Sequence, residues 1–137
     1  MILPAAYFLV SFLGYASAKG INCQGSGACG LAKTEIPRIA NILNGDGAYP
    51  GISDTRWYNN GQNIYCGENT DSWSCVFLQK SGGAPGKSIK KLIRALADHN
   101  CVHCGSVPLF YPDDNNIENG ELTVNIVTDP HGCKGVC

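Results

Sequence analysis

The sequence predicts a single small α+β domain that is held together by disulfide bonds. Eight cysteines all lie beyond residue 18, as in small exported proteins whose cores are reinforced by disulfides. Two segments carry apolar side chains at helical spacing, whereas others alternate in the manner of half-buried strands. Glycine, asparagine and proline separate these segments, so we expect short elements joined by turns.

Residues 1–18 are predicted to be a secretory signal peptide. They carry no charged side chain, contain an apolar stretch and end in Ala16-Ser17-Ala18, a small-residue pattern typical of a cleavage site. A membrane-spanning helix usually needs about 20 apolar residues, and no later segment reaches that length. We therefore expect cleavage after Ala18 and a secreted, extracellular, monomeric domain formed by residues 19–137.

The charges of the chain are balanced. Ten lysine and arginine residues stand against eleven aspartate and glutamate residues, which gives a net charge of −1. A protein that binds nucleic acid or an anionic membrane surface usually carries a positive excess. We therefore expect no nucleic-acid partner and no membrane insertion.

The even number of cysteines predicts four disulfides. The eight residues are Cys23, Cys29, Cys66, Cys75, Cys101, Cys104, Cys133 and Cys137. Only Cys101 and Cys104 form a C-x-x-C motif, and an oxidising compartment favours disulfides over structural zinc. This motif follows the end of a predicted helix, where the helix dipole opposes thiolate formation, so a redox-active pair is also disfavoured. The spacing alone leaves the pairing open.

The first predicted helix lies within residues 34–45. Its apolar side chains recur at helical spacing: Ile36, Ile39, Ala40 and Leu43. Thr34 is the predicted N-cap, and Pro37 lies in the first turn, where its missing N–H costs little. Gly45 is placed to end the helix.

The segment SIKKLIRALADHN, residues 88–100, predicts a second amphipathic helix that begins near Gly86 or Ser88. Its apolar stripe consists of Ile89, Leu92, Ile93 and Leu96, and its basic face of Lys87, Lys90, Lys91 and Arg94. Gly86-Lys87-Ser88 is similar to the end of a phosphate-binding loop, but Ser81 stands where that motif needs its first glycine. We therefore interpret the stretch before the helix as a Gly-Pro turn.

Two longer strands are predicted from alternation. Trp73, Cys75 and Phe77 alternate with Ser74, Val76 and Leu78, and Leu122, Val124 and Ile126 alternate with Thr123, Asn125 and Val127. Shorter strands are expected at residues 63–66 and 107–111, the second at the sheet periphery because it contains Pro108. Residues 44–61 are expected to form a long loop, and residues 113–120 a turn.

Three sequence blocks occur in a distinctive order: GINCQGSGACG at 20–30, HNCVHCGSVPLFY at 99–111 and GELTVNIV at 120–127. They contain an N-C-x5-C-G start, a C-x-x-C-G-S-x-P-L block after a helix and a G-x-L-T-V-N strand. Together these blocks resemble the virus-encoded killer toxins of smut fungi, the killer-protein-four family, and their fungal and plant relatives. The blocks bracket nearly all of the chain beyond the predicted signal peptide.

The resemblance implies an α/β sandwich, in which an antiparallel sheet with split βαβ connections carries two antiparallel helices on one face. It also implies that Cys23 and Cys29 pair with Cys101 and Cys104. The resemblance likewise implies that Cys66 is bonded to a cysteine of the C-terminal region. We therefore expect Cys66 and Cys75 to pair with Cys133 and Cys137, with the choice of partners left open.

The resemblance further implies a toxin that inhibits the growth of competitor or host cells by blocking voltage-gated calcium channels from outside. A rigid body would present a basic side chain to a pore mouth lined by carboxylates, without catalysis, cofactor or metal. In the toxins, a basic residue shortly before the cysteine that matches Cys66 is implicated. Here that stretch is GQNIYC and carries no charge.

Two surfaces are therefore candidates for contact with a cell-surface target. One is the basic helix face of Lys87, Lys90, Lys91 and Arg94. The other is Arg56 with Trp57 in the long loop, because arginine and aromatic side chains are common at contact surfaces.

Two other classes of function are weighed against the toxin. An effector or inhibitor module that binds another extracellular host protein would keep the same fold. A small secreted hydrolase would need an acid/base pair drawn from three histidines and several glutamates: His99, His103, His131, Glu35, Glu68, Glu118 and Glu121. No known motif arranges these residues, so we expect no enzymatic activity.

Overall fold

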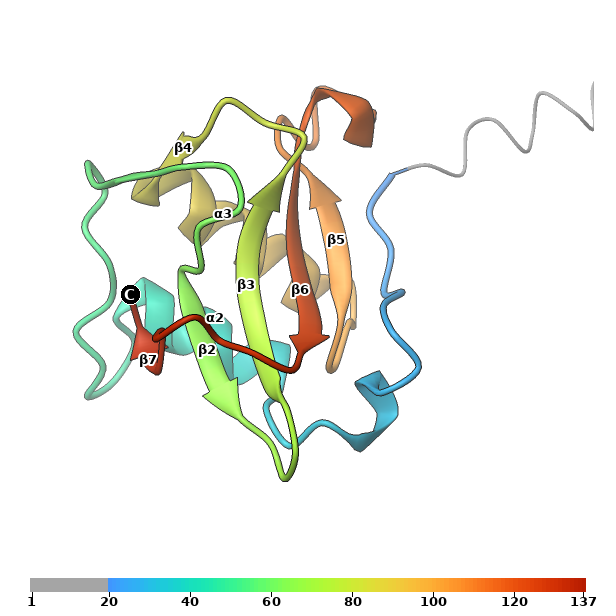
Figure 1. The fold of residues 1–137 in the computed structure, drawn as a ribbon. Coiled ribbons are helices and arrows are strands. Elements are labelled where there is room, and N and C mark those ends of the chain that lie inside the picture. The colour runs from blue at the N-terminus through green and yellow to red at the C-terminus, as the bar shows by residue number, and fades with distance from the viewer. Residues whose placement is uncertain (1–19) are drawn as a thin grey trace, which may run out of the picture.

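The computed structural model describes residues 20–137 (Figure 1). The predicted signal peptide at residues 1–18 lies outside the described residues. Within residues 20–137, no helix is long and apolar enough to cross a bilayer.

A five-stranded antiparallel sheet with the order β5-β6-β3-β2-β7 forms one layer of the molecule (Figure 1). Its strands are β2 (Tyr65–Glu68), β3 (Trp73–Gln79), β5 (Gly105–Pro108), β6 (Glu121–Val127) and β7 (Gly135–Val136). The central pair is β3 with β6, in register from Trp73 opposite Val127 to Gln79 opposite Glu121. The two strands predicted from alternation are thus confirmed.

The shorter predicted strands exist but are displaced along the chain. The strand expected at residues 63–66 is β2, which begins at Tyr65, and the strand expected at residues 107–111 is β5, which ends at Pro108. As predicted, β5 lies at an edge of the named strands. Beyond it, Asn22 and Ser106 exchange two backbone hydrogen bonds of 2.9 Å, so the N-terminal segment lies along the outer side of β5.

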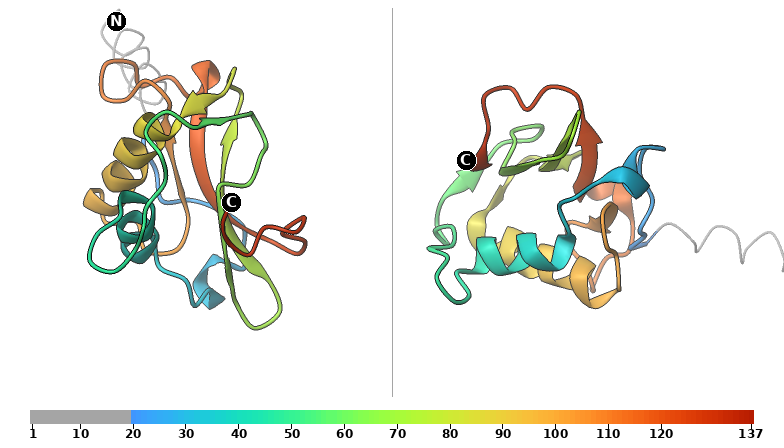
Figure 2. Two further views of the ribbon diagram at one scale, coloured as in Figure 1. Left: turned by 90° about the vertical axis from the view of Figure 1, so that its left-hand side faces the viewer. Right: turned by 90° about the horizontal axis from the view of Figure 1, so that it is seen from below.

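Two helices, α2 (Ile36–Asn44) and α3 (Gly86–Asp98), pack side by side on one face of the sheet (Figure 2). They run antiparallel: the Asn44 side chain at the end of α2 donates to the Lys90 carbonyl in α3, and the Ile36 amide donates to the Val102 carbonyl beyond the end of α3. The helix α3 connects β3 to β5, and β6 lies between these two strands. This is the expected split βαβ connection.

The helix ends agree only in part with the sequence prediction. Gly45 ends α2 in the left-handed conformation, with φ 74°, as expected. The N-cap of α2 is Glu35 and not Thr34, and it makes no side-chain capping bond. Of the two expected starting points of α3, Gly86 is the first helical residue, and Ser88 lies inside the helix.

A second, two-stranded sheet was not predicted. It pairs β1 (Trp57–Tyr58), inside the expected long loop, with β4 (Ala84–Pro85), inside the expected turn. Strands of two residues are too short to show alternation, and their pairing joins distant parts of the chain. The segment expected as a turn at 113–120 also contains a short 3-10 helix, Ile117–Asn119.

The hydrophobic core lies between the helices and the sheet. The helices contribute Ile36, Ile39, Leu43, Ile89, Ile93 and Leu96, and the sheet contributes Val76, Leu78, Val107, Leu122 and Val124, all buried. Both apolar helix stripes predicted from the sequence therefore face the sheet. Burial of this apolar surface is the main force that holds the two layers together.

The four disulfides confirm one pairing and correct another. Cys23 bonds Cys101 and Cys29 bonds Cys104, so the N-terminal segment is fixed to the end of α3 as expected. The predicted pairing of Cys66 and Cys75 with the two C-terminal cysteines is wrong. Instead Cys66 bonds Cys75, and Cys133 bonds Cys137.

Local geometry explains the corrected pairing. Cys66 and Cys75 are directly opposite on β2 and β3, with their Cα atoms 4.2 Å apart. The C-terminal segment then reverses, with Gly135 at φ 82°, and brings Cys133 and Cys137 together. All four sulfurs belong to one cluster on the sheet face away from the helices, so the prediction placed them in the right region but with the wrong partners.

Candidate target-contact surface

The two candidate contact surfaces lie next to each other in the structure. The Gly86 amide at the start of α3 donates to the Arg56 carbonyl at 2.7 Å, and the Lys87 amide donates to the Asp54 carbonyl at 3.0 Å. The short pairing of β1 with β4 joins the same segments. We call the combined set the loop–helix surface: Arg56, Trp57, Lys87, Lys90, Lys91 and Arg94.

Two of the predicted cations on this surface are neutralised. The Lys90 ammonium lies 2.9 Å from Oδ1 of Asp54, and the Arg94 guanidinium lies 2.6 Å from Oδ2 of Asp46. Arg94 also donates to the Asn41 side chain at 3.2 Å. Lys90 and Arg94 therefore attach α3 to the loop after α2 and are less available to a target than the sequence implied.

The ion pair changes the acidity of its carboxylate. The hydrogen bond from Lys90, its positive charge and the charge of Lys87 together hold the pKa of Asp54 below its ordinary value. Asp54 therefore stays ionised in mildly acidic surroundings and continues to hold Lys90.

The other cations of the loop–helix surface remain free. Within residues 20–137, Lys87 and Lys91 have no carboxylate within ion-pair distance and are exposed. The Arg56 guanidinium lies 4.6 Å from the centre of the Tyr58 ring, an arrangement that holds the side chain without removing its charge.

Trp57 is the large apolar side chain of this surface. It remains 55% exposed although its indole packs against Gly83, where an added Cβ would lie 2.6 Å from Nε1. The loop–helix surface thus combines an anchored, half-exposed tryptophan with three free cations. Such a combination suits contact with an acidic partner surface.

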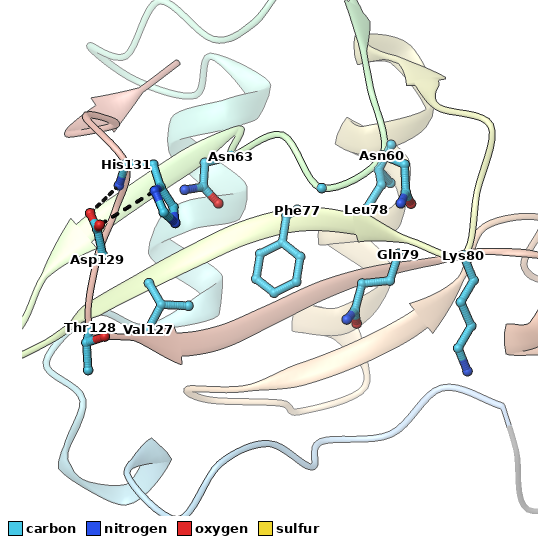
Figure 3. Close-up of a pocket in the computed structure, with 11 residues that line it drawn as sticks. Asn60, Asn63, Phe77, Leu78, Gln79, Lys80, Val127, Thr128, Asp129 and His131 are labelled. Carbon is cyan, nitrogen blue, oxygen red and sulfur yellow. Dashed lines mark hydrogen bonds and ion pairs between the residues drawn. The ribbon is translucent and has the colours of Figure 1, made fainter.

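A second feature, which sequence reasoning missed, is a cavity of about 520 Å³ on the sheet face away from the helices (Figure 3). Phe77 and Val127 lie on the sheet strands beneath it, and Asp129 and His131 lie at one end (Figure 3). The His131 ring lies 3.5 Å from the Asp129 carboxylate, and both side chains are exposed. The sequence carried a signal for this site: the outward positions of β3 and β6 include the apolar residues Phe77 and Val127. No helix of the described chain covers this face, and both residues stay only partly buried, against the disulfide cluster.

The acid/base pair considered for a hydrolase is not assembled in the part of the chain that the structure describes. His103 contacts the Thr34 carbonyl and His131 contacts Asp129, but no hydrogen bond or ion pair there joins a histidine to a glutamate. In the same range, no three His, Cys, Asp or Glu residues are grouped so that they could hold a metal ion.

Comparison with known proteins gives two matches. A family model described as Kp4 matches residues 6–128. The KP4 killer toxin of Ustilago maydis P4 virus is 29% identical over 127 residues, an alignment that covers 88% of this chain and 89% of the toxin. The region matched by the family model therefore includes both helices, the central strands and the paired cysteines at 23, 29, 101 and 104.

Proposed function

Because this chain belongs to the Kp4 family, we propose that it is a secreted killer-toxin-like protein that blocks a voltage-gated calcium channel from outside. The block inhibits growth of competitor or host cells. The disulfide-bonded body needs no cofactor for this task, and it acts as a monomer on a cell-surface membrane protein.

The observation that carries this proposal is the set of three free cations beside an exposed tryptophan. Arg56, Lys87 and Lys91 have no carboxylate partner in the described chain, whereas Lys90 and Arg94 do. The mouths of cation channels are commonly lined by rings of carboxylates, which attract a positively charged side chain. Trp57 adds apolar contact area beside these charges.

The test uses the purified, oxidised protein on fungal and plant-root cells. We expect growth inhibition together with reduced calcium influx, and we expect excess external calcium to relieve both. The double variant Lys87→Gln/Lys91→Gln and the single variant Arg56→Gln should each weaken the effect, whereas Lys80→Gln, outside the loop–helix surface, should not. Unchanged calcium influx at concentrations that stop growth would overturn channel block.

A second candidate, an effector or inhibitor module for another extracellular protein, is favoured by the uncovered sheet-face cavity. Its floor of Phe77 and Val127 is apolar, so it suits an apolar side chain of another protein better than it suits the carboxylates of a channel mouth. Under this alternative, Phe77→Ser would abolish activity while the variants of Lys87 and Lys91 remained active. The two sets of variants therefore separate the two functions.

A further inference from the structure

We propose that a small cavity between the start of α2 and strand β2 is a binding site for a single carboxylate group. The cavity has a volume of about 230 Å³ and is lined by Lys33, Thr34, Arg38, Tyr65, Gly67 and Glu68. It shares no residue with the loop–helix surface or with the sheet-face cavity. The proposal does not depend on the function proposed above.

Two free cations line this cavity. Within the described chain, neither Lys33 nor Arg38 has a carboxylate within ion-pair distance, although Glu68 lines the same cavity. By contrast, Lys80, Lys90 and Arg94 each have an acidic partner. The positive charges of Lys33 and Arg38 are therefore available to bind an anion from outside the chain.

A hydroxyl without a partner in the described chain also lines this cavity. Thr34 is only 9% exposed, and its main chain is held on both sides: its amide donates to Asn69 at 3.3 Å and its carbonyl contacts His103. Its side-chain Oγ1, however, makes no hydrogen bond within residues 20–137. Among the described residues, the Tyr58 hydroxyl is the one fully buried polar side-chain atom without a partner, so Thr34 Oγ1 is open to solvent and can donate to an oxygen of a ligand.

Tyr65 supplies a second hydroxyl to the same place. A Cβ added at Gly67 would lie 2.6 Å from Thr34 Oγ1 and 3.2 Å from the Tyr65 hydroxyl, so both hydroxyls lie over this glycine. Burial raises the pKa of Tyr65, whereas the positive charge of Arg38, which lines the same cavity, acts in the opposite direction. The phenol thus stays protonated at neutral pH and can donate.

The charge balance favours a carboxylate over a dianion. Two cations and one carboxylate line the cavity, so a single negative charge neutralises it, whereas a phosphate dianion would meet repulsion from Glu68. The volume is below the roughly 300 Å³ at which pockets for drug-sized ligands begin. The site therefore fits one carboxylate, with Arg38 and the hydroxyls of Thr34 and Tyr65 as donors to its oxygens.

The test is a titration of the ¹⁵N-labelled, oxidised protein with sodium acetate, followed by NMR. Sodium chloride and sodium sulfate at matched ionic strength serve as comparisons. We expect saturable shifts of the Thr34 and Gly67 amides and of the Arg38 side chain with acetate, and weaker or unsaturable shifts with the other salts. A triglutamate peptide should shift the same signals; tighter binding than acetate identifies a protein side chain as the source of the carboxylate, and equal binding identifies a free acid.

Three variants decide whether these residues form the site. Arg38→Gln should weaken acetate binding by about tenfold, as expected for loss of a charge-assisted bond. Thr34→Val should weaken it several-fold, and Thr34→Ser, which keeps the hydroxyl, should restore it. Lys91→Gln is the matched control and should bind acetate unchanged. Shifts that chloride reproduces, or an acetate affinity that is unchanged in Arg38→Gln, would overturn the proposal.

Discussion

The ammonium group of Lys90 lies 2.9 Å from the Asp54 carboxylate and joins α3 to the loop that precedes β1. Arg94 and Asp46 form a second pair one turn further along the same side of the helix. Both carboxylates belong to the connection between α2 and β1, which also accepts backbone bonds from Gly86 and Lys87. On the basic face of α3, Lys90 and Arg94 therefore hold the loop, whereas Lys87 and Lys91 remain free in the part of the chain that the structure describes.

The first prediction concerns the acidity of Asp54. Its pKa should lie below that of an ordinary aspartate, mainly because Lys90 donates a hydrogen bond to it. Lys90→Met should return the pKa most of the way to its ordinary value, whereas Lys91→Met should leave it unchanged. Titration of the carboxyl carbon by NMR measures both effects.

The sign of the accompanying pH dependence follows from the lowered pKa. Because Asp54 is more acidic in the folded protein than in the unfolded chain, the pair stabilises the fold above the ordinary aspartate pKa. That contribution is lost as the pH falls through the lowered pKa. If Asp54 titrated identically in the parent protein and in Lys90→Met, the pair would have no influence in solution.

The second prediction concerns Gly86, the first residue of α3. A Cβ at this position would overlap the Ser53 carbonyl oxygen, and the loop would have to move to admit it. Gly86→Ala should therefore lower the free energy of unfolding by about 1–3 kcal/mol, the usual range for overpacking. Denaturant unfolding is the measurement.

Gly82 provides the matched control for this substitution. A Cβ there meets no atom within 4 Å, so Gly82→Ala should change stability by less than about 0.5 kcal/mol. Equal stability of the two variants would mean that the contact between loop and helix is not tight in solution.

The third prediction concerns the two bridges at the N-terminal segment. Cys23–Cys101 and Cys29–Cys104 close loops with sequence separations of 78 and 75, but once one bridge is present the other closes only a short additional loop. Removal of either pair by serine substitution should therefore cost about 2–3 kcal/mol, and removal of both should cost more than the two single losses together.

Chemical unfolding of the two double-serine variants and of the quadruple variant tests this cooperation. Replacement of Cys133 and Cys137, which are only four positions apart, is the control and should cost about 2 kcal/mol or less. Strictly additive losses for the two long-range bridges would show that they do not restrict the same part of the unfolded chain.

The fourth prediction concerns Tyr58. The residue is completely buried, and its hydroxyl has no hydrogen-bond partner in the described structure. Tyr58→Phe should leave stability unchanged or raise it by up to about 1 kcal/mol, since it removes a polar group that burial penalises. The phenyl ring keeps the contact with Arg56. A lower melting temperature for the variant would indicate that the hydroxyl bonds a buried water molecule.

The elements that could be predicted from the sequence are those whose signal is local. The stripe of Ile89, Leu92, Ile93 and Leu96 predicts an amphipathic helix without any knowledge of its tertiary contacts. The alternation of apolar and polar residues in β3 and β6 predicts a strand in the same way. The pairing of β1 with β4 could not be predicted, because each strand has only two residues and the partner lies elsewhere in the sequence.

The partners of charged residues and of cysteines could not be predicted either, because the sequence shows which residues can pair but not which of them meet in the fold. Asp54 and Asp46 neutralise Lys90 and Arg94 across separations of 36 and 48 residues, so a helix face that seems uniformly basic in the sequence is only partly so. Cys66 and Cys75 pair because of the register of a hairpin. That register is fixed by the turn between Glu68 and Trp73, which are opposite each other.

The bridge between Asn22 and Ser106 has a further consequence for self-association. An open strand edge presents unpaired amide and carbonyl groups that recruit other chains, and proteins commonly cover such edges. Here the covering segment is fixed by Cys23–Cys101, immediately beside Asn22. Reduction of that bond would release the cover and leave β5 open to intermolecular strand addition. The disulfide that stabilises the native state would thus also prevent aggregation through β5 when the protein is concentrated.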